Sequence, residues 1–236
     1  MTCHLLKGRL SLGMKRPEQA ILSYRHAKGI RADMPAYHGL VKSLIAAKRF
    51  KEALFTAKEA VKDIPNSARA LTLLADVHAQ DARSRAKARQ LYDKALALDP
   101  TCTEAVLSLC DLEVAVHSYE EAILLLKRHV SQSPSDAIYV KLANVCASWS
   151  QVLDDESLPS LLGDALRYFQ EALRMNPYCE AARRGVTKIE KLMKGMDPDA
   201  GDGDLDEGDE MDAEAGDAGG MDHFDSTMDM DLQWIS

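Results

Sequence analysis

The side chains best suited to metal binding or nucleophilic catalysis are seven histidines and five cysteines, and their spacing favours neither. The cysteines are Cys3, Cys102, Cys110, Cys146 and Cys179, and the histidines are His4, His26, His38, His78, His117, His129 and His223. There is no C-x-x-C pair and no His at zinc-ligand spacing from a Cys. We therefore expect buried, reduced thiols rather than a structural zinc site or a disulfide framework.

The sequence also lacks the short motifs that mark common reaction centres. It contains no G-x-x-x-x-G-K-[ST], G-x-G-x-x-G, H-E-x-x-H or G-x-S-x-G. Asp202, Asp204 and Asp206 imitate the start of an EF-hand calcium loop. However, Glu207 stands where that loop needs Gly, and Ala213 where it needs a bidentate Glu. The sequence predicts a protein that is not an enzyme and that binds no cofactor and no metal.

Charge is divided unevenly along the chain, whose formal net charge is −8. Residues 195–236 contain 15 of the 37 Asp and Glu residues and none of the 29 Lys and Arg residues. A basic body and an acidic tail are two physically different parts. Lys48, Arg49 and Lys51 fall in a turn between helices rather than in a basic and aromatic patch, so we expect no nucleic acid partner. No run approaches the ~20 apolar residues of a membrane span, so we expect no membrane partner either.

Three marks recur along the body: an Ala, a small residue seven positions later and a Pro five positions beyond that. The Pro marks lie 35, 34 and 43 residues apart. Such a period predicts helix hairpins, in which small residues allow close helix contacts and Pro ends each hairpin. The residues expected to pack the hairpins are Gly8, Ala20, Ala27, Ala53, Ala60, Pro65, Ala88, Ala95, Pro100, Ala122, Pro134, Ala165, Ala172 and Pro177.

These marks resemble the tetratricopeptide repeat, whose W-x-x-L-G pattern appears here weakened at its first aromatic, as in Leu71, Leu74 and Ala75. The resemblance implies an all-α, right-handed solenoid of about five helix hairpins. The expected hairpins span about 1–33, 34–67, 68–102, 103–135 and 136–177. A helix over 178–195 is predicted to cap the last apolar face, followed by a disordered acidic tail over 196–236.

The last hairpin departs from the pattern. Ala143 and Ala165 are 22 residues apart, where the repeat expects about 12. We expect an insertion near 149–162 that forms a loop, or a loop with one extra helical turn. It is either a solvated excursion or a contact with a partner through Trp149 and Leu153.

Both ends of the chain carry expectations of their own. Residue 1 falls within the first helix of a hairpin, with no capping unit before it, so we expect a fragment of a longer repeat protein or the product of a shortened gene. The last residues, MDHFDSTMDMDLQWIS, hold Phe224, Leu232, Trp234 and Ile235 in an acidic field. They are either a short docking segment or a solubilising tail with incidental aromatics.

The resemblance implies that the binding surface is a concave groove lined by the first helices. Arg9, Lys42 and Arg69 make the N-terminal half of this groove basic, which suits an acidic or carboxylate-bearing peptide. The alternative is that the groove residues are ordinary solvated side chains. They do not reproduce the two-Lys, two-Asn, one-Arg carboxylate clamp of chaperone-binding tetratricopeptide domains. The family's groove positions correspond here to Arg9, His38, Lys42, Arg69, Thr72, Asp76, Asp111 and Asn144.

A narrower resemblance covers about residues 4–195. The sequence is similar to the C-terminal repeats of the subunit seven family of the anaphase-promoting complex in HLLKGRLSLGMKRPEQAILSYRHAKGIRADMPAYHGLVKSLIAAKRFKEALFTAKEAV, ARALTLLADVHAQDARSRAKARQLYDKALALDPTCTEAVL, EEAILLLKRHV and NPYCEAARRGVTKIEKL.

This resemblance implies a non-catalytic scaffold of a cell-cycle E3 ubiquitin ligase. Such a chain would have protein partners only, would stack with other tetratricopeptide subunits in support of substrate ubiquitination and mitotic progression, and would act in the nucleus and cytoplasm. Two alternatives stay open. One is a stand-alone, co-chaperone-like peptide-binding adaptor, and the other is the repeat arm of a larger enzyme.

Overall fold

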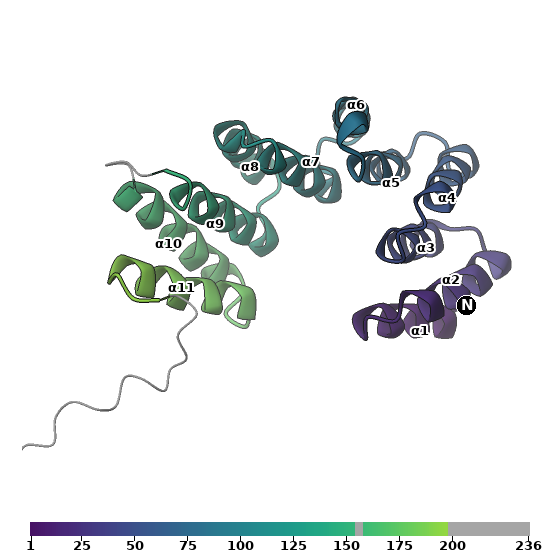
Figure 1. Ribbon diagram of the computed structural model, residues 1–236, viewed down its shortest axis with the longest axis horizontal. Coiled ribbons are helices and arrows are strands. Elements are labelled where there is room, and N and C mark those ends of the chain that lie inside the picture. The colour runs from purple at the N-terminus through teal and green to yellow at the C-terminus, as the bar shows by residue number, and fades with distance from the viewer. Residues whose placement is uncertain (154–157, 198–236) are drawn as a thin grey trace, which may run out of the picture. The chain divides into compact units, whose positions relative to one another are not determined.

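The computed structural model describes residues 1–153 and 158–197, which fold almost entirely into α-helices with no strand among them. The helices are α1 (Thr2–Gly13), α2 (Pro17–Ile30), α3 (Met34–Ala46), α4 (Phe50–Asp63), α5 (Ala68–Ala79), η1 (Ala82–Ser84, a 3-10 turn), α6 (Arg85–Leu98), α7 (Thr103–Ala115), α8 (Tyr119–Gln132), α9 (Asp136–Ser150), α10 (Leu158–Met175) and α11 (Glu180–Met193). Consecutive helices α1 to α10 pair into five hairpins, and α11 follows as a cap (Figure 1). The predicted all-α hairpin stack is confirmed. The acidic tail from residue 198 onward lies outside the described residues.

Three hairpin turns share one backbone geometry. In each, three residues join the two helices, and the middle residue, Lys15, Lys48 or His117, has a left-handed φ of 56°, 58° or 63°. The residue after it donates its backbone N–H back across the turn, as Arg49 does to the carbonyl of Leu44 at 2.9 Å. This Schellman arrangement satisfies carbonyls that the end of a helix leaves free and reverses the chain direction.

Side-chain caps set where several first helices begin. Asp33, Ser67 and Ser135 each accept a hydrogen bond from the backbone N–H three residues later, with N···O distances of 3.2, 3.3 and 3.4 Å. These bonds satisfy amide groups that the helix itself cannot. Pro17 and Pro35 occupy the first turn of α2 and α3, where a missing N–H costs nothing.

The hairpins stack so that the first helices form one layer and the second helices form another, and the helices of the first layer lie closer together. Each first helix contacts the first helix of the next hairpin, in the order α1, α3, α5, α7 and α9, and α11 continues this series by contacting α9. Each second helix packs closely against the first helices on either side of it. Within residues 1–153 and 158–197 the backbones of two second helices do not approach closely, and charged side chains bridge them, as between α2 and α4. We call the closely packed side of the first helices the inner face and the side of the second helices the outer face.

The repeat alanines lie at the helix contacts. Gly8 is buried against the ring of Tyr24, and a Cβ on Gly8 would lie 2.7 Å from Tyr24 Cε2. The prolines Pro65, Pro100, Pro134 and Pro177 are exposed in the connections between hairpins. All of the predicted packing alanines are fully buried: Ala20, Ala27, Ala53, Ala60, Ala88, Ala95, Ala122, Ala165 and Ala172. Small residues therefore sit where helices approach most closely.

The last hairpin accommodates its extra residues partly as helix. α10 has 18 residues where α2 and α4 have 14, which adds about one turn. The ring of Trp149 stacks on Tyr119 with centroids 6.2 Å apart. Trp149 thus contributes to packing within the stack, which does not support the alternative of a partner contact through this residue. Residues 154–157 of the predicted insertion lie outside the described residues.

Candidate protein-binding groove

One position of each first helix recurs on the inner face. It holds Arg9 in α1, Lys42 in α3, Asp76 in α5, Asp111 in α7 and Asn144 in α9. A repeat of constant length returns the same helical turn to the same face of the stack. The position carries two bases, then two acids, then an amide. The charge of the inner face therefore changes from basic to acidic between the second and third hairpins.

The N-terminal part of the inner face contains a pocket of about 410 Å³, which we call the basic pocket. Arg9 and Lys42 both line it, and neither forms an ion pair within the described part of the chain. The third polar group, His38, has a pKa lowered first by burial and then by Lys42. His38 is therefore neutral at pH 7. The other lining residues are Leu5, Leu6, Leu12, Tyr24, Pro35 and Gly39.

Two glycines shape this pocket by admitting an aromatic ring. The ring of Tyr24, on α2, lies against Gly8 of α1 and Gly39 of α3, and a Cβ at Gly39 would collide with the ring carbons. The tyrosine reaches the inner face only because these two positions lack a side chain. The result is an apolar pocket with two unpaired cations at its edge, which suits an apolar side chain next to a carboxylate.

A second pocket, of about 340 Å³, lies between the second, third and fourth hairpins and is lined by both Asp76 and Asp111. The hydroxyl of Tyr92 donates a 2.7 Å hydrogen bond to Asp76 Oδ1. Burial raises the pKa of Asp76, against the opposing effect of the bonds from Tyr92 and Ser108. Asp111 pairs with Lys141 of α9. These acids are thus held by neighbouring groups. Arg9 and Lys42 form no ion pair among the described residues, although Lys42 also lines this second pocket and its charge contributes to lowering the pKa of Asp76.

A third, smaller pocket of about 200 Å³ brings His38 together with Arg69 and Glu104. Arg69 Nε lies 3.9 Å from Glu104 Oε2, so its charge is partly compensated. The prediction of a basic N-terminal half of the groove therefore applies to the first two hairpins only.

Two predicted groove residues do not lie in these pockets. Thr72 is only 2% exposed, and its hydroxyl donates to the backbone carbonyl of Ala68 at 2.9 Å. It lies beneath the inner face, so its prediction as a binding residue is wrong. Asn144 is exposed on α9 but is not among the residues that line the three pockets.

Some lining residues were not predicted as groove residues. Tyr24 and Tyr92 are large residues between two repeat alanines, which indicates packing within the hairpin, yet both rings also line pockets. Ser108 and Arg85 line the second pocket as well. Arg85 comes from the start of α6, after η1, and the repeat pattern alone gives no signal for that displaced turn.

The cysteines divide into buried and accessible thiols. Cys102, Cys110 and Cys146 are buried as expected. Cys3 is exposed, so the expectation is wrong for that residue, and Cys179 is only half-buried. Burial raises the pKa of Cys110 to about 12 and that of Cys146 to about 11. Thiols with such pKa values are weak nucleophiles at pH 7. Within the described ranges no cluster of His, Cys, Asp and Glu is placed to hold a metal ion, and no helix could span a membrane.

Comparison with protein families and solved structures agrees with this architecture. The tetratricopeptide-repeat family matches residues 38–101 and 79–145. A thermophilic tetratricopeptide-repeat protein from Thermus thermophilus superposes with a TM-score of 0.63 at 16% identity, over 80% of this chain and 98% of that one. Human IFIT1 superposes with a TM-score of 0.55 at 19% identity, over 77% of this chain and 43% of that one. At these identities the likeness concerns the fold.

Sequence relatives are more specific. The chain is 42% identical over 199 residues to anaphase-promoting complex subunit 7 of Arabidopsis thaliana, which covers 84% of this chain and 34% of that protein. It is 31% identical over 196 residues to the subunit 7 protein of Dictyostelium discoideum, over 83% of this chain and 32% of that protein. The human subunit 7 protein is 27% identical over 188 residues, with 79% and 32% covered. The chain thus spans about a third of the length of these relatives.

The hairpin stack, the repeat matches and these relatives agree with one another. The chain belongs to the tetratricopeptide-repeat proteins and is a homologue of anaphase-promoting complex subunit 7.

Proposed function

We propose that the chain is a non-catalytic scaffold subunit of the anaphase-promoting complex, a cell-cycle E3 ubiquitin ligase, and acts in the nucleus and cytoplasm. It packs against other tetratricopeptide subunits and so supports substrate ubiquitination and mitotic progression. The observation that carries this proposal is the 42% identity to the Arabidopsis subunit 7 protein over 84% of the chain.

The chemistry of the inner face is consistent with a scaffold. Asp76 is hydrogen-bonded by Tyr92, and the Cys110 and Cys146 thiols stay protonated at pH 7 because burial raises their pKa values. Their burial and hydrogen bonding support a structural rather than a catalytic role. Recognition in a solenoid comes from surface that consecutive repeats present together.

Affinity purification of the tagged chain from dividing cells, followed by quantitative mass spectrometry, tests the proposal. We expect the other subunits of the ligase at near-equal stoichiometry. Recovery of chaperones alone, or of the chain without ligase subunits, would refute it.

The basic pocket favours one second candidate, a stand-alone peptide-binding adaptor. Its apolar walls and the unpaired Arg9 and Lys42 suit a short acidic peptide with an apolar residue. An adaptor of this kind would bind such a peptide tightly and elute as a small complex. In that case Arg9→Glu together with Lys42→Glu would abolish the interaction, whereas a scaffold that uses other surfaces would keep its ligase partners.

A further inference from the structure

Large apolar side chains recur at one exposed position of the second helices. Leu22 in α2, Phe55 in α4 and Leu124 in α8 each stand two residues after a repeat alanine, and they are 59%, 72% and 60% exposed. The same position holds Gln90 in α6 and Arg167 in α10. A single exposed apolar residue is ordinary, but an exposed phenylalanine beside a hollow is typical of a protein-binding surface.

Phe55 stands beside such a hollow. The outer face has a hollow of about 610 Å³ between α2 and α4, which we call the outer hollow, and Phe55 lines it. Leu40 and Thr56, both buried, lie among its other lining residues, and Gly29 adds no side chain. The space is available because the backbones of α2 and α4 do not approach closely, and only charged side chains bridge the two helices. It is large enough for one or two apolar side chains of a partner.

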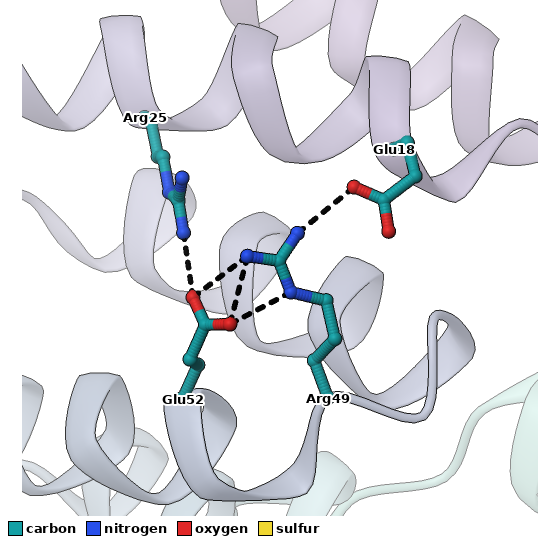
Figure 2. Close-up of polar contacts among 4 residues, drawn as sticks. All are labelled: Glu18, Arg25, Arg49 and Glu52. Carbon is teal, nitrogen blue, oxygen red and sulfur yellow. Dashed lines mark hydrogen bonds and ion pairs between the residues drawn. The ribbon is translucent and has the colours of Figure 1, made fainter.

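The charged groups around the outer hollow are tied to one another. Figure 2 shows Glu52 of α4 bound by Arg25 of α2 and by Arg49, whose guanidinium also reaches Glu18 of α2. The N···O distances are 2.7 Å from Arg25 to Glu52, 2.8 and 2.9 Å from Arg49 to Glu52, and 2.9 Å from Arg49 to Glu18. These contacts hold the rim in one arrangement, so less side-chain freedom is lost when a partner binds.

Of the three cations that line the outer hollow, two already have partners. Arg25 pairs with Glu52, and Lys28 pairs with Glu59. Lys51 forms no ion pair in the described part of the chain. The complementary group on a partner is therefore a carboxylate that reaches Lys51 while an apolar side chain enters the hollow beside Phe55.

We propose that the outer hollow is a docking site for a helix of a partner protein. Lys51 and Phe55 stand four residues, or about one turn, apart on α4 and both line the hollow, and a partner helix presents two side chains at the same spacing. That helix inserts an aliphatic or aromatic side chain next to Phe55 and carries an Asp or Glu one turn away that pairs with Lys51. The inference rests on the proposed function, because it names the face through which the chain contacts another ligase subunit.

Site-specific photo-cross-linking in the tagged full chain tests the docking site. A benzoylphenylalanine replaces Phe55 in one version and Leu124 in the other, which is a matched control at the same repeat position and of similar exposure. We expect position 55 to cross-link to one helical peptide of a ligase subunit, with an Asp or Glu within a turn of the linked residue. Position 124 should not give this product. Equal cross-linking at both positions would overturn the proposal.

Substitutions supply a second readout. Phe55→Asp should lower recovery of the cross-linked subunit by roughly tenfold or more, as expected for a central aromatic contact, while Leu124→Asp leaves recovery unchanged. Lys51→Glu should weaken recovery, and reversal of the partner's acidic residue to Lys should restore it. Both Asp variants should melt at the temperature of the unsubstituted chain, because the replaced side chains are exposed.

The outcomes separate the two proposals. If the unsubstituted chain recovers the ligase and Phe55→Asp recovers it equally well, the docking site is wrong and the scaffold proposal stands. If the unsubstituted chain recovers no ligase subunit, the scaffold proposal fails. The docking site is then decided by cross-linking at position 55, where absence of a helical partner with the stated acidic residue would overturn it.

Discussion

The inner and outer faces of the first two hairpins are built from the same four helices but differ in how far their cations are paired. On the inner face, Arg9 and Lys42 stand unpaired beside an apolar pocket. On the outer face, Arg25 and Arg49 are both bound to Glu52. An unpaired cation keeps its attraction for an external carboxylate, and on the outer face, within the described residues, only Lys51 among the cations lining the hollow does so. The paired cations there leave recognition mainly to the apolar side chains around them. One pair of hairpins therefore presents two surfaces with different partner chemistry.

Tyr24→Ala should disrupt both the inner and the outer face of the first two hairpins. The ring packs between Gly8 and Gly39 and belongs to the core of the first two hairpins, so both faces depend on it. By analogy with other large buried aromatic residues, its removal should cost about 3–5 kcal/mol of unfolding free energy. Urea denaturation measures this loss. The control, Tyr178→Ala at an exposed position, should change stability by less than about 0.5 kcal/mol. A similar small change for Tyr24→Ala would contradict the packing described.

Substitution of one glycine on each face should show that the inner face is packed more tightly than the outer face. Gly39→Ala should cost about 1–3 kcal/mol, because the new Cβ meets the Tyr24 ring and overpacks the basic pocket. Gly29 lines the outer hollow, and a Cβ added there would meet nothing within 4 Å. Gly29→Ala should therefore stabilise α2 by about 0.5–1 kcal/mol. Thermal denaturation of both variants measures the difference, and a loss at both positions would show that the outer face is as tightly packed as the inner one.

Salt dependence should separate paired from unpaired charge. Arg49→Ala removes the contacts to Glu52 and Glu18 and should lower the melting temperature slightly, by less than Tyr24→Ala or Gly39→Ala does. The loss should shrink in about 1 M NaCl, where the Debye length is about 3 Å. Lys42→Ala removes no ion pair and should not lower the melting temperature at either salt concentration. An equal, salt-sensitive loss for both variants would contradict the distinction.

The smallest expected effect is a pKa change at His38. Lys42 contributes to lowering the pKa of His38, after the larger effect of burial. Lys42→Ala should therefore move this pKa upward, still below the ordinary value of about 6.5 because burial remains. Since the folded pKa lies below the unfolded one, protonation of His38 should reduce stability as the pH falls below about 6.5. Titration of the imidazole by NMR measures the shift, and an unchanged or lower pKa in the variant would exclude Lys42 as a neighbour.

Most of the fold could be predicted because the repeat marks have direct physical causes. Ala53 and Ala60 must be small where helices touch, and Pro65 must lie outside a helix interior. These requirements hold for each hairpin, so the marks recur at a readable period. The length of α10 was harder to predict, because an insertion has no second copy in the sequence against which its helix boundary can be compared.

The candidate site was less predictable from sequence. Position in the repeat identified Arg9 and Lys42 correctly as inner-face residues, but it also placed Thr72 there. Whether such a side chain reaches the surface depends on its size and on the neighbouring helices. Thr72 is short enough to bond its own backbone at Ala68 and stay buried. Charge pairing across hairpins, as between Arg25 and Glu52, also depends on distances that no single repeat contains.

Hydroxyl-radical footprinting tests the docking site on the outer face, and with it the division between the two faces, most directly. Side-chain oxidation would be compared between the isolated chain and the same chain within the purified ligase. We predict that Phe55 is oxidised readily in the isolated chain and becomes protected in the assembly, while Leu124 keeps its reactivity. Equal oxidation of Phe55 in both states would contradict the account.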